Sequence, residues 1–226
     1  MFRRTRPDEY LTKMRADWDA RARANAHHYI ADGKTDWTPD EFYSSGSTDV
    51  EGHILTDFEN ICQGKPPREM SVLEYGCGAG RVTRALAQIF GEVHAVDISS
   101  EMLQRASQAL ADCKNVRFYQ TDGASLSALG DLKFDFAFSC CVFHHVSSYD
   151  VIKSCVSEVG RRLLPGRLFK FEVQGCLGVQ SERNDTWVGV PFSLDQARKM
   201  ARDCGFELRY HRGSERERFW LWFFKT

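Results

Sequence analysis

The chain has 226 residues, with 30 basic against 31 acidic side chains and 42% hydrophobic residues. This length fits one globular domain with a short appendage, which can bury enough apolar surface to fold without disulfides or a structural metal. The net charge of −1 provides none of the positive field on which nonspecific nucleic-acid binding depends. The composition therefore argues against a protein that coats DNA or RNA, and no nucleic-acid partner is expected.

The sequence carries no sign of export or of a membrane span. A spanning helix needs about 18 uninterrupted apolar residues, and the richest apolar run covers only 219–224. The basic start of the chain is followed by acidic residues rather than by the apolar stretch of a secretion signal. The eight cysteines contain no C-x-x-C pair, and several lie in apolar stretches, as reduced cysteines do. We therefore expect a protein of the reducing cytoplasm.

Residues 1–68 are predicted to form a helical extension, which ends at the consecutive prolines 66 and 67. Apolar side chains recur at three- and four-residue steps in its first half, as they do along one face of a helix. The expected elements are a helix over 9–30, an irregular stretch over 37–47 and a second helix over 50–62.

From residue 69 onward, short β-branched or aromatic runs alternate with helical patterns. Such alternation indicates βαβ units and an α/β domain built on a parallel sheet. Apolar residues occupy both faces of the run at 219–224, so this last strand is expected inside the sheet rather than at its edge. The predicted strands cover 71–75, 92–96, 116–120, 134–139, 167–173, 206–211 and 217–225, and a helix that starts with a Ser-x-x-Gln capping box covers 194–204.

Residues 72–83 have the pattern of a strand, a tight glycine turn and the start of a helix. Glycine lets the backbone adopt a positive φ and approach a ligand, while the new helix directs its amide groups at the turn. Two later carboxylates make this a predicted nucleotide site. Asp97 ends the second strand, where it can accept from both hydroxyls of a ribose, and Asp122 ends the third, where it can accept from an adenine amine.

The spacing of the glycines separates two classes of nucleotide site. Dinucleotide-binding turns have the pattern G-x-G-x-x-G, whereas Gly76, Gly78 and Gly80 alternate as G-x-G-x-G behind the acidic Glu74. A pyrophosphate would meet the carboxylate of Glu74 unfavourably, but a cationic end of a ligand would not. The pattern therefore favours a ligand with a cationic group over a nicotinamide dinucleotide.

At these positions the sequence resembles the class I S-adenosylmethionine-dependent methyltransferases, in their small-molecule, quinone-biosynthesis-like branch. The resemblance extends from about residue 70 to the end of the chain. It implies a Rossmann-like, doubly wound, mostly parallel seven-stranded sheet of order 3-2-1-4-5-7-6, with residues 1–68 as a helical lid on a methyltransferase domain over 69–226. The segments that carry it, in order, are 72–80, 93–103, 120–123, 134–146 and 163–168.

The resemblance also implies S-adenosyl-L-methionine as cofactor and S-adenosyl-L-homocysteine as product. Glu74 and the glycine backbone would hold the methionine end, Asp97 the ribose and Asp122 the adenine amine, while Ser139 would present its carbonyl to the cofactor's amino group. The implied cofactor-binding positions are Glu74, Gly76, Cys77, Gly78, Gly80, Asp97, Ile98, Met102, Asp122, Gly123 and Ser139.

Residues 139–146, after the fourth strand, lack the Asn/Asp-Pro-Pro-aromatic pattern of methylases that act on amino groups of nucleic acids and proteins. The resemblance therefore favours a small-molecule acceptor, with oxygen as the favoured atom and carbon or nitrogen as alternatives. His144 or His145 is a candidate to accept a proton from a substrate hydroxyl. The alternative is that one histidine packs and the other caps the next helix, because methyl transfer can proceed by positioning alone.

The N-terminal extension is expected to cover the acceptor, although its aromatic residues could instead only pack the helix onto the domain. No metal site is predicted, because His27 and His28 are neighbours on a helix and do not face the same way. Two functions of other classes stay open, a noncatalytic S-adenosylmethionine-binding subunit or sensor and a nicotinamide-dependent oxidoreductase. The candidate acceptor contacts are Trp18, Asn25, Tyr29, Tyr43, Arg183 and Trp187.

Overall fold

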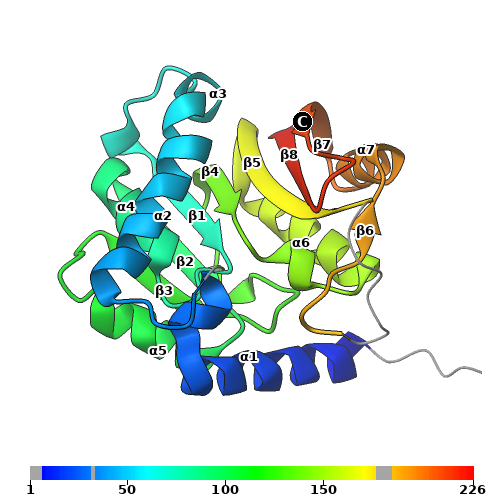
Figure 1. Cartoon of the computed structure of the whole chain (residues 1–226). Helices are drawn as coiled ribbons and strands as arrows, with labels where there is room; N and C mark the ends of the chain where they lie inside the picture. The colour runs from blue at the N-terminus through cyan, green and yellow to red at the C-terminus, as the bar shows by residue number, and fades with distance from the viewer. Residues whose placement is uncertain (1–6, 32–33, 177–184) are drawn as a thin grey trace, which may run out of the picture.

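A computed structural model describes residues 7–31, 34–176 and 185–226. One mixed sheet forms the centre of the molecule, and helices pack on both of its faces (Figure 1). The helices are α1 (Pro7–Ile30), α2 (Pro39–His53), α3 (Phe58–Cys62), α4 (Arg81–Ile89), α5 (Ser100–Ala109), α6 (Tyr149–Arg162) and α7 (Leu194–Asp203). The strands are β1 (Ser71–Tyr75), β2 (Glu92–Asp97), β3 (Val116–Gln120), β4 (Phe134–Ser139), β5 (Leu163–Gly175), β6 (Pro191–Phe192), β7 (Phe206–Arg212) and β8 (Arg218–Lys225).

The strand order is β3-β2-β1-β4-β5-β8-β7, with the two-residue β6 paired to the end of β5. Strands β1 to β5 run parallel, and β8 lies antiparallel between β5 and β7. Without β6, which the sequence analysis did not predict, this is the expected order 3-2-1-4-5-7-6. The prediction that the doubly apolar last strand lies inside the sheet is confirmed.

The prediction of an irregular stretch at 37–47 was wrong, because α2 begins at Pro39 and runs through it. Thr38 and Glu41 form a capping box, in which each side chain accepts from the backbone amide of the other residue. Gly46 lets α2 pack closely on the start of α4, since a Cβ at this position would lie 2.1 Å from the carbonyl oxygen of Arg81. Tertiary packing thus outweighs the weak helix propensity of this serine- and glycine-containing stretch. The predicted helix over 50–62 is correspondingly divided between the end of α2, a short 3-10 turn and α3.

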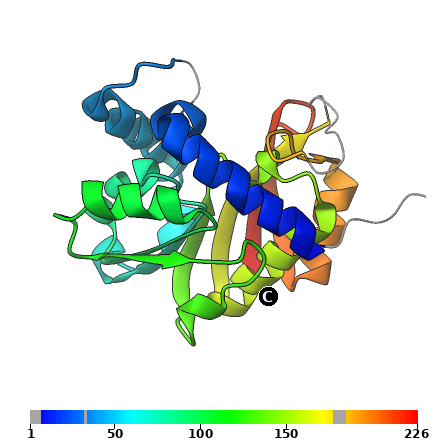
Figure 2. The same cartoon turned by 90° about the horizontal axis from the view of Figure 1, so that it is seen from below.

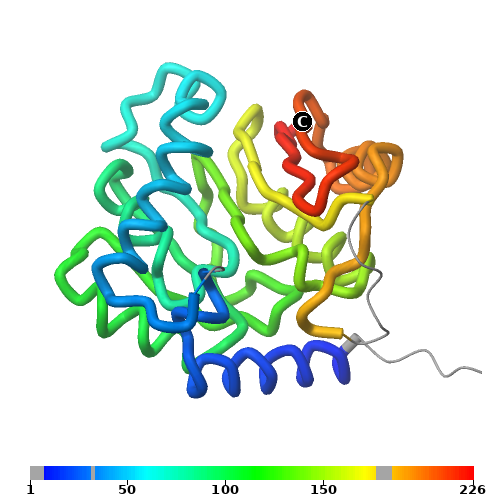
Figure 3. Tube along the Cα trace, viewed as in Figure 1, coloured from blue at the N-terminus to red at the C-terminus, as the bar shows by residue number. Residues whose placement is uncertain are grey.

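The two faces of the sheet are covered by different sets of helices. One core contains residues of α6, α7 and the first half of α1, and the other contains residues of α2, α3 and α4. The trace in Figure 3 passes from α1 along α2 and α3 before it enters the sheet at β1. Within the described residues, no helix is both long enough and apolar enough to cross a membrane.

The position of α1 matters most for function. Tyr10 and Met14 on this helix are buried in the same core as α6 and α7. Viewed from below, α1 lies across the molecule at the edge where the parallel strands end (Figure 2). Loops that follow parallel strands meet at this edge, which is where α/β sheets bind ligands. The helix therefore covers the part of the sheet where the predicted nucleotide site lies.

Candidate active site

A hollow opens at the carboxyl ends of β1, β2 and β4, beneath α1. It encloses about 900 Å³ that protein atoms do not fill, part of it open to solvent. Its lining residues are Met14, Trp18, Tyr29, Ile30, Glu74, Tyr75, Gly76, Cys77, Gly78, Arg81, Val82, Val96, Asp97, Ile98, Met102, Thr121, Gly123, Cys140, Cys141, Val142, Phe143, His145, Val146 and Cys155.

The glycine turn after β1 forms one wall of the hollow with its backbone. Gly76 has φ 80° and Gly78 has φ 53°, in the left-handed region that favours glycine. A Cβ at Gly76 would lie 2.3 Å from Val142, and one at Gly78 would lie 2.8 Å from Ile30. The amides of Gly76 and Cys77 both donate to the carbonyl of Val96, which fixes the turn to β2. Any larger side chain at these two glycines would therefore disturb the wall.

Asp97, at the end of β2, is held rigidly beside this turn. The amide of Gly78 donates to Oδ2 at 2.8 Å, and the amide of Ser99 donates to Oδ1 at 2.8 Å. Burial raises the pKa of Asp97 to about 6, although these backbone bonds act in the opposite direction. The carboxylate is thus fixed in place and keeps lone pairs for a ligand.

Glu74, the fourth residue of β1, is a second buried carboxyl group in the hollow, with 4% of its surface exposed. The hydroxyl of Thr83 donates to its Oε2 at 2.6 Å. Burial raises the pKa of Glu74 to about 7, against the lowering effects of this hydrogen bond and of Arg81. A positively charged ligand group would stabilise its ionised form.

The structure gathers most, but not all, of the predicted cofactor positions into this hollow. Glu74, Gly76, Cys77, Gly78, Asp97, Ile98, Met102 and Gly123 line it, whereas Gly80, Asp122 and Ser139 are not among its lining residues.

The carboxylate of Asp122 is exposed and accepts from the amides of Ala124 and Ser125 at 2.8 and 2.7 Å. Ser139 is buried, and its hydroxyl donates to the carbonyl of Tyr75 at 2.8 Å. Gly80 is the N-cap residue of α4. The ligand contacts of these three residues stay predictions.

Helix α1 is tied to the rest of the molecule at both sides of the hollow. On one side, Asp19 accepts from the hydroxyl of Ser99 at 2.6 Å, next to Asp97. On the other side, Arg21 donates to the carbonyl and the hydroxyl of Thr186 at 2.9 and 3.0 Å. The Thr186 hydroxyl in turn donates to Asp17 at 2.6 Å. These contacts make α1 a strap across the hollow.

An aromatic cluster lies at this strap and combines three of the predicted acceptor contacts with one histidine. The ring of Trp18 lies 6.2 Å from that of Trp187 and 5.2 Å from that of His145, and Tyr29 lies 5.8 Å from Trp187. The guanidinium of Arg21 lies over both tryptophans, at 4.7 and 5.1 Å. Sequence reasoning had placed Trp18, Tyr29 and Trp187 in one site on two separate segments, and the structure brings them together.

The remaining predicted acceptor contacts lie elsewhere. Asn25 is the break in α1, with an extended backbone; its side chain donates to the carbonyl of Thr35 and accepts from the amide of His28. Tyr43 lies under the guanidinium of Arg84, and its hydroxyl donates to Ala79 at 3.4 Å. Neither residue lines the hollow. Arg183 lies outside the described residues.

The two candidate catalytic histidines differ in position. His145 lines the hollow, is 8% exposed, and donates from Nδ1 to the carbonyl of Trp187 at 2.5 Å. Burial and the neighbouring His144 hold the pKa of His145 well below its ordinary value. Burial thus disfavours the protonated form of His145, which makes this ring a weak base. His144 points its Nδ1 at Glu172, 3.2 Å away, and does not line the hollow.

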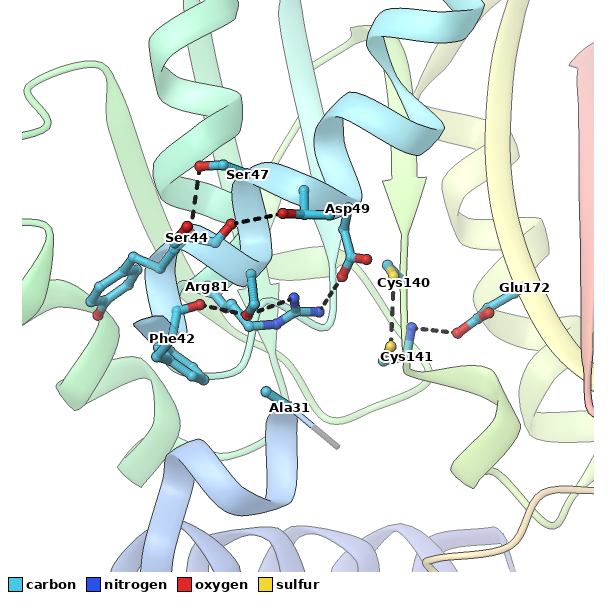
Figure 4. Close-up of polar contacts among 12 residues, drawn as sticks. Ala31, Phe42, Ser44, Ser47, Asp49, Arg81, Cys140, Cys141 and Glu172 are labelled. Atoms are coloured by element: carbon cyan, nitrogen blue, oxygen red, sulfur yellow. Dashed lines mark hydrogen bonds and ion pairs between the residues drawn. The ribbon is translucent and has the colours of Figure 1, made fainter. Parts of the chain in front are cut away.

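Three residues at the floor of the hollow had no assigned role in the sequence analysis. Arg81 is only 5% exposed and pairs with Asp49 at 2.6 Å, and Cys140 and Cys141 follow β4 directly (Figure 4). All three line this hollow and a second one that adjoins it on the side of α2. The sequence signals that could have identified them are the position of Arg81 next to the glycine turn and that of the two cysteines after a parallel strand.

Comparisons with known proteins agree with this geometry. Residues 72–166 match the family described as "Methyltransferase domain". N-demethylindolmycin N-methyltransferase from Streptomyces griseus is 33% identical over 114 residues, which cover 50% of this chain and 44% of that protein. The chain spans less than half of the length of the curated relatives it matches.

Two solved structures show the same fold over almost the whole chain. Magnesium protoporphyrin IX methyltransferase from Synechocystis PCC 6803, with bound S-adenosylhomocysteine, has a TM-score of 0.70 at 18% identity and covers 95% of this chain and 99% of its own. An S-adenosylmethionine-dependent methyltransferase from Clostridium acetobutylicum has a TM-score of 0.66 at 17% identity, with 95% and 98% coverage. The sheet and its helices thus have the fold of S-adenosylmethionine-dependent methyltransferases.

Proposed function

We propose that this chain, whose residues 72–166 match the family described as "Methyltransferase domain", is a class I methyltransferase that transfers a methyl group from S-adenosylmethionine to a small molecule, with oxygen as the favoured acceptor. The observation that carries the proposal is the pair of carboxyl groups of Glu74 and Asp97. They come from adjacent parallel strands and line one hollow beside the glycine turn. The ammonium and the ribose hydroxyls of the cofactor match these two groups in charge and in hydrogen-bonding capacity.

The cofactor is proposed to lie along this wall. Glu74 would bind its ammonium, Asp97 would accept from the ribose hydroxyls, and the apolar side chains of Ile98 and Met102 would flank the adenine. Gly123, whose backbone borders the same hollow, would supply an amide nearby. Asp122 and Ser139 are weaker candidates, because neither lines the hollow in this conformation.

The acceptor is proposed to enter beneath α1, against Trp18, Tyr29 and Trp187. In the reaction the acceptor oxygen forms a bond to the methyl carbon, the carbon–sulfur bond breaks, and sulfur keeps the electron pair as S-adenosylhomocysteine. The acceptor proton leaves to solvent or to His145, which is a weak base here. Aromatic faces and exclusion of water favour the transfer, since they position the acceptor beside a sulfonium that is poorly hydrated.

Other features support a small-molecule acceptor and a cytoplasmic setting. The names of two matched proteins specify N-demethylindolmycin and magnesium protoporphyrin IX, which are both small molecules but different in kind. Because these two acceptors differ in kind, they do not indicate the acceptor atom of this chain. Oxygen is favoured on the sequence pattern alone. All eight cysteines are free thiols, as in a reducing compartment.

The proposal is tested by calorimetric titration with S-adenosylhomocysteine, S-adenosylmethionine and NAD. We expect dissociation constants on the order of micromolar for the first two and at least tenfold weaker binding of NAD. A preference for NAD would overturn the proposal in favour of an oxidoreductase. Tight cofactor binding, with no S-adenosylhomocysteine formed from S-adenosylmethionine in the presence of a cell metabolite extract, would support the noncatalytic sensor instead.

A further inference from the structure

Cys140 and Cys141, which directly follow β4, have side chains that converge, unlike those of neighbouring residues in a strand. Successive side chains of a strand point to opposite faces, yet the Sγ atoms of Cys140 and Cys141 lie 3.6 Å apart. Cys141 achieves this with φ 60°, in the left-handed region that a residue with a Cβ rarely adopts. Unusual backbone of this kind gathers at ligand sites, so the convergence of the two sulfurs calls for a function.

A third donor lies beside the two sulfurs. A carboxylate oxygen of Glu172 lies within 4.8 Å of both sulfur atoms. Glu172 comes from β5, is fully buried, and accepts from the amide of Cys141 through Oε1 at 2.7 Å (Figure 4). Its Oε2 is buried as well and has no hydrogen-bond partner among the described residues. A buried carboxylate oxygen without a partner is costly and points to an absent ligand.

We propose that Cys140, Cys141 and Glu172 bind a thiophilic divalent cation, with Zn²⁺ as the best fit. At a Zn–S distance of 2.3 Å, two thiolates of a tetrahedral site lie about 3.8 Å apart, close to the separation observed here. A disulfide fits less well, because it needs sulfurs about 2.05 Å apart and Cα atoms usually 4.4–6.8 Å apart, whereas consecutive Cα atoms are about 3.8 Å apart.

The charges around the three donors suit a bound cation. Two thiolates and one carboxylate around Zn²⁺ leave a net charge of −1, which the Arg218 guanidinium offsets, since its Nη1 lies 2.8 Å from the sulfur of Cys141 and 3.0 Å from Oε1 of Glu172. Arg81, the other nearby guanidinium, is neutralised by Asp49. The two cysteines line both hollows, so a cation has a path to them.

Three protein ligands leave one tetrahedral position for water or a substrate atom. This position would face the hollows next to the proposed cofactor. A metal there would polarise an acceptor hydroxyl and ease loss of its proton, a task for which His145 is poorly suited. That catalytic role rests on the proposed function, whereas binding of the metal does not.

The experiment is titration of the reduced full-length chain, purified without a histidine tag, with Zn²⁺ in competition with a chromophoric chelator and with no cofactor present. We expect one Zn²⁺ per chain. Cys140→Ser and Cys141→Ser should each weaken binding at least 100-fold, and Glu172→Gln at least tenfold. Cys176→Ser, which changes an exposed thiol away from the cluster, is the matched control and should stay within twofold.

A spectroscopic measurement tests the metal site without the variant of the buried Glu172, which could fail to fold. With Co²⁺ as the probe, we expect thiolate-to-metal charge-transfer bands and the intense visible bands of a tetrahedral site, both lost in Cys140→Ser. Absence of stoichiometric Zn²⁺ binding, or binding that persists when both cysteines are serine, would overturn the proposal. Because these measurements need no cofactor, their failure leaves the methyltransferase proposal intact, and failure of cofactor binding leaves the metal site intact.

Discussion

The hollow beneath α1 has two walls that are built in different ways. The wall formed by residues 74–102, which we call the backbone wall, contains the glycine turn and two carboxyl groups fixed by a neighbouring hydroxyl and by amides. The other wall is formed by side chains of α1 such as Trp18, behind which lies Trp187 from a segment far away in the sequence. The first wall is suited to one ligand of fixed shape, because backbone hydrogen bonds hold its glycine turn and the carboxylate of Asp97. We therefore assign the cofactor to the first wall and acceptor specificity to the second.

The largest effect is expected where a side chain of the backbone wall is removed. Asp97→Ala should weaken S-adenosylhomocysteine binding about 100-fold or more, since two ribose hydroxyls lose a charged acceptor and each such bond is worth roughly 1.5–3 kcal/mol. Calorimetry measures the change. Folding should survive, with a lowered melting temperature, because the amides of Gly78 and Ser99 lose their acceptor.

The control for this variant is Asp112→Ala, which removes an exposed carboxylate that does not line the hollow. It should leave the affinity unchanged. If Asp97→Ala bound the cofactor within twofold of the wild type, the backbone wall would not be the cofactor site and the comparison of the two walls would lose its basis.

The second wall should control ligand exchange more than affinity. Arg21→Ala removes two hydrogen bonds to Thr186 and the contacts with Trp18 and Trp187, which together are worth about 2 kcal/mol. We expect the dissociation rate of S-adenosylhomocysteine to rise about tenfold, with a smaller change in the dissociation constant. Displacement of radiolabelled ligand measures the rate.

Arg23→Ala is the matched control, because Arg23 lies on the same helix and pairs with Glu101 through a side chain that is itself exposed. It should leave the rate unchanged. An equal effect of both variants would mean that α1 responds as a whole to any loss of contact, and that it does not act as a strap held at Thr186.

The cofactor affinity of the backbone wall should depend on pH through Glu74. The pKa of Glu74 is about 7 without ligand, so the group is largely protonated below that pH and cannot pair with an ammonium. We therefore expect cofactor affinity to fall about tenfold between pH 7.5 and pH 6, and to level off above pH 8. Calorimetry across this range measures the dependence.

Glu74→Gln should bind more weakly at pH 8 and should lose the pH dependence between 6.5 and 7.5. A further fall below pH 6 should remain in this variant, because the pKa of Asp97 is about 6. An identical pH profile in wild type and variant would show that Glu74 does not contact the cofactor.

The difference between the two walls also explains which parts of the fold and the site could be predicted from the sequence. The G-x-G-x-G turn and Asp97 are close in sequence, and their roles follow from local backbone geometry, so their place in one hollow was predictable. The strand order was predictable because alternation and the doubly apolar run at 219–224 are local patterns. Helix α2 was missed, although its Thr38–Glu41 capping box is visible in the sequence, because the contact of Gly46 with Arg81 outweighs propensity.

The acceptor side was only partly predictable, because its residues are distant in the sequence and meet only through folding. Trp18, Tyr29 and Trp187 meet through the folding of α1 against residues 185–187, and their aromatic character was the single clue. Asn25 has a polar side chain of the kind that contacts ligands, but it forms the break in α1. The convergence of Cys140 and Cys141 depends on one positive φ angle, which nothing in a pair of adjacent cysteines indicates.

The smallest effect is expected at His145, where the walls meet. Because the pKa of this ring is held well below its ordinary value in the folded state, the unfolded chain binds a proton more readily there. Stability is therefore fully present above about pH 6.5 and is lost as pH falls, by up to about 1.4 kcal/mol per pH unit. His145→Gln removes this contribution.

Thermal unfolding of both proteins at pH 8 and pH 5.5 measures the difference. The variant should be less stable than the wild type at pH 8, because the bond to the carbonyl of Trp187 is weakened, and the gap should narrow by about 2–4 °C at pH 5.5. Because burial disfavours protonation of His145, this ring should add no step near pH 6.5 to methyl transfer measured at saturating S-adenosylmethionine. A gap that widens on acidification would mean that His145 is charged in the folded protein, and the weak base at this junction would then become a cationic contact for the acceptor.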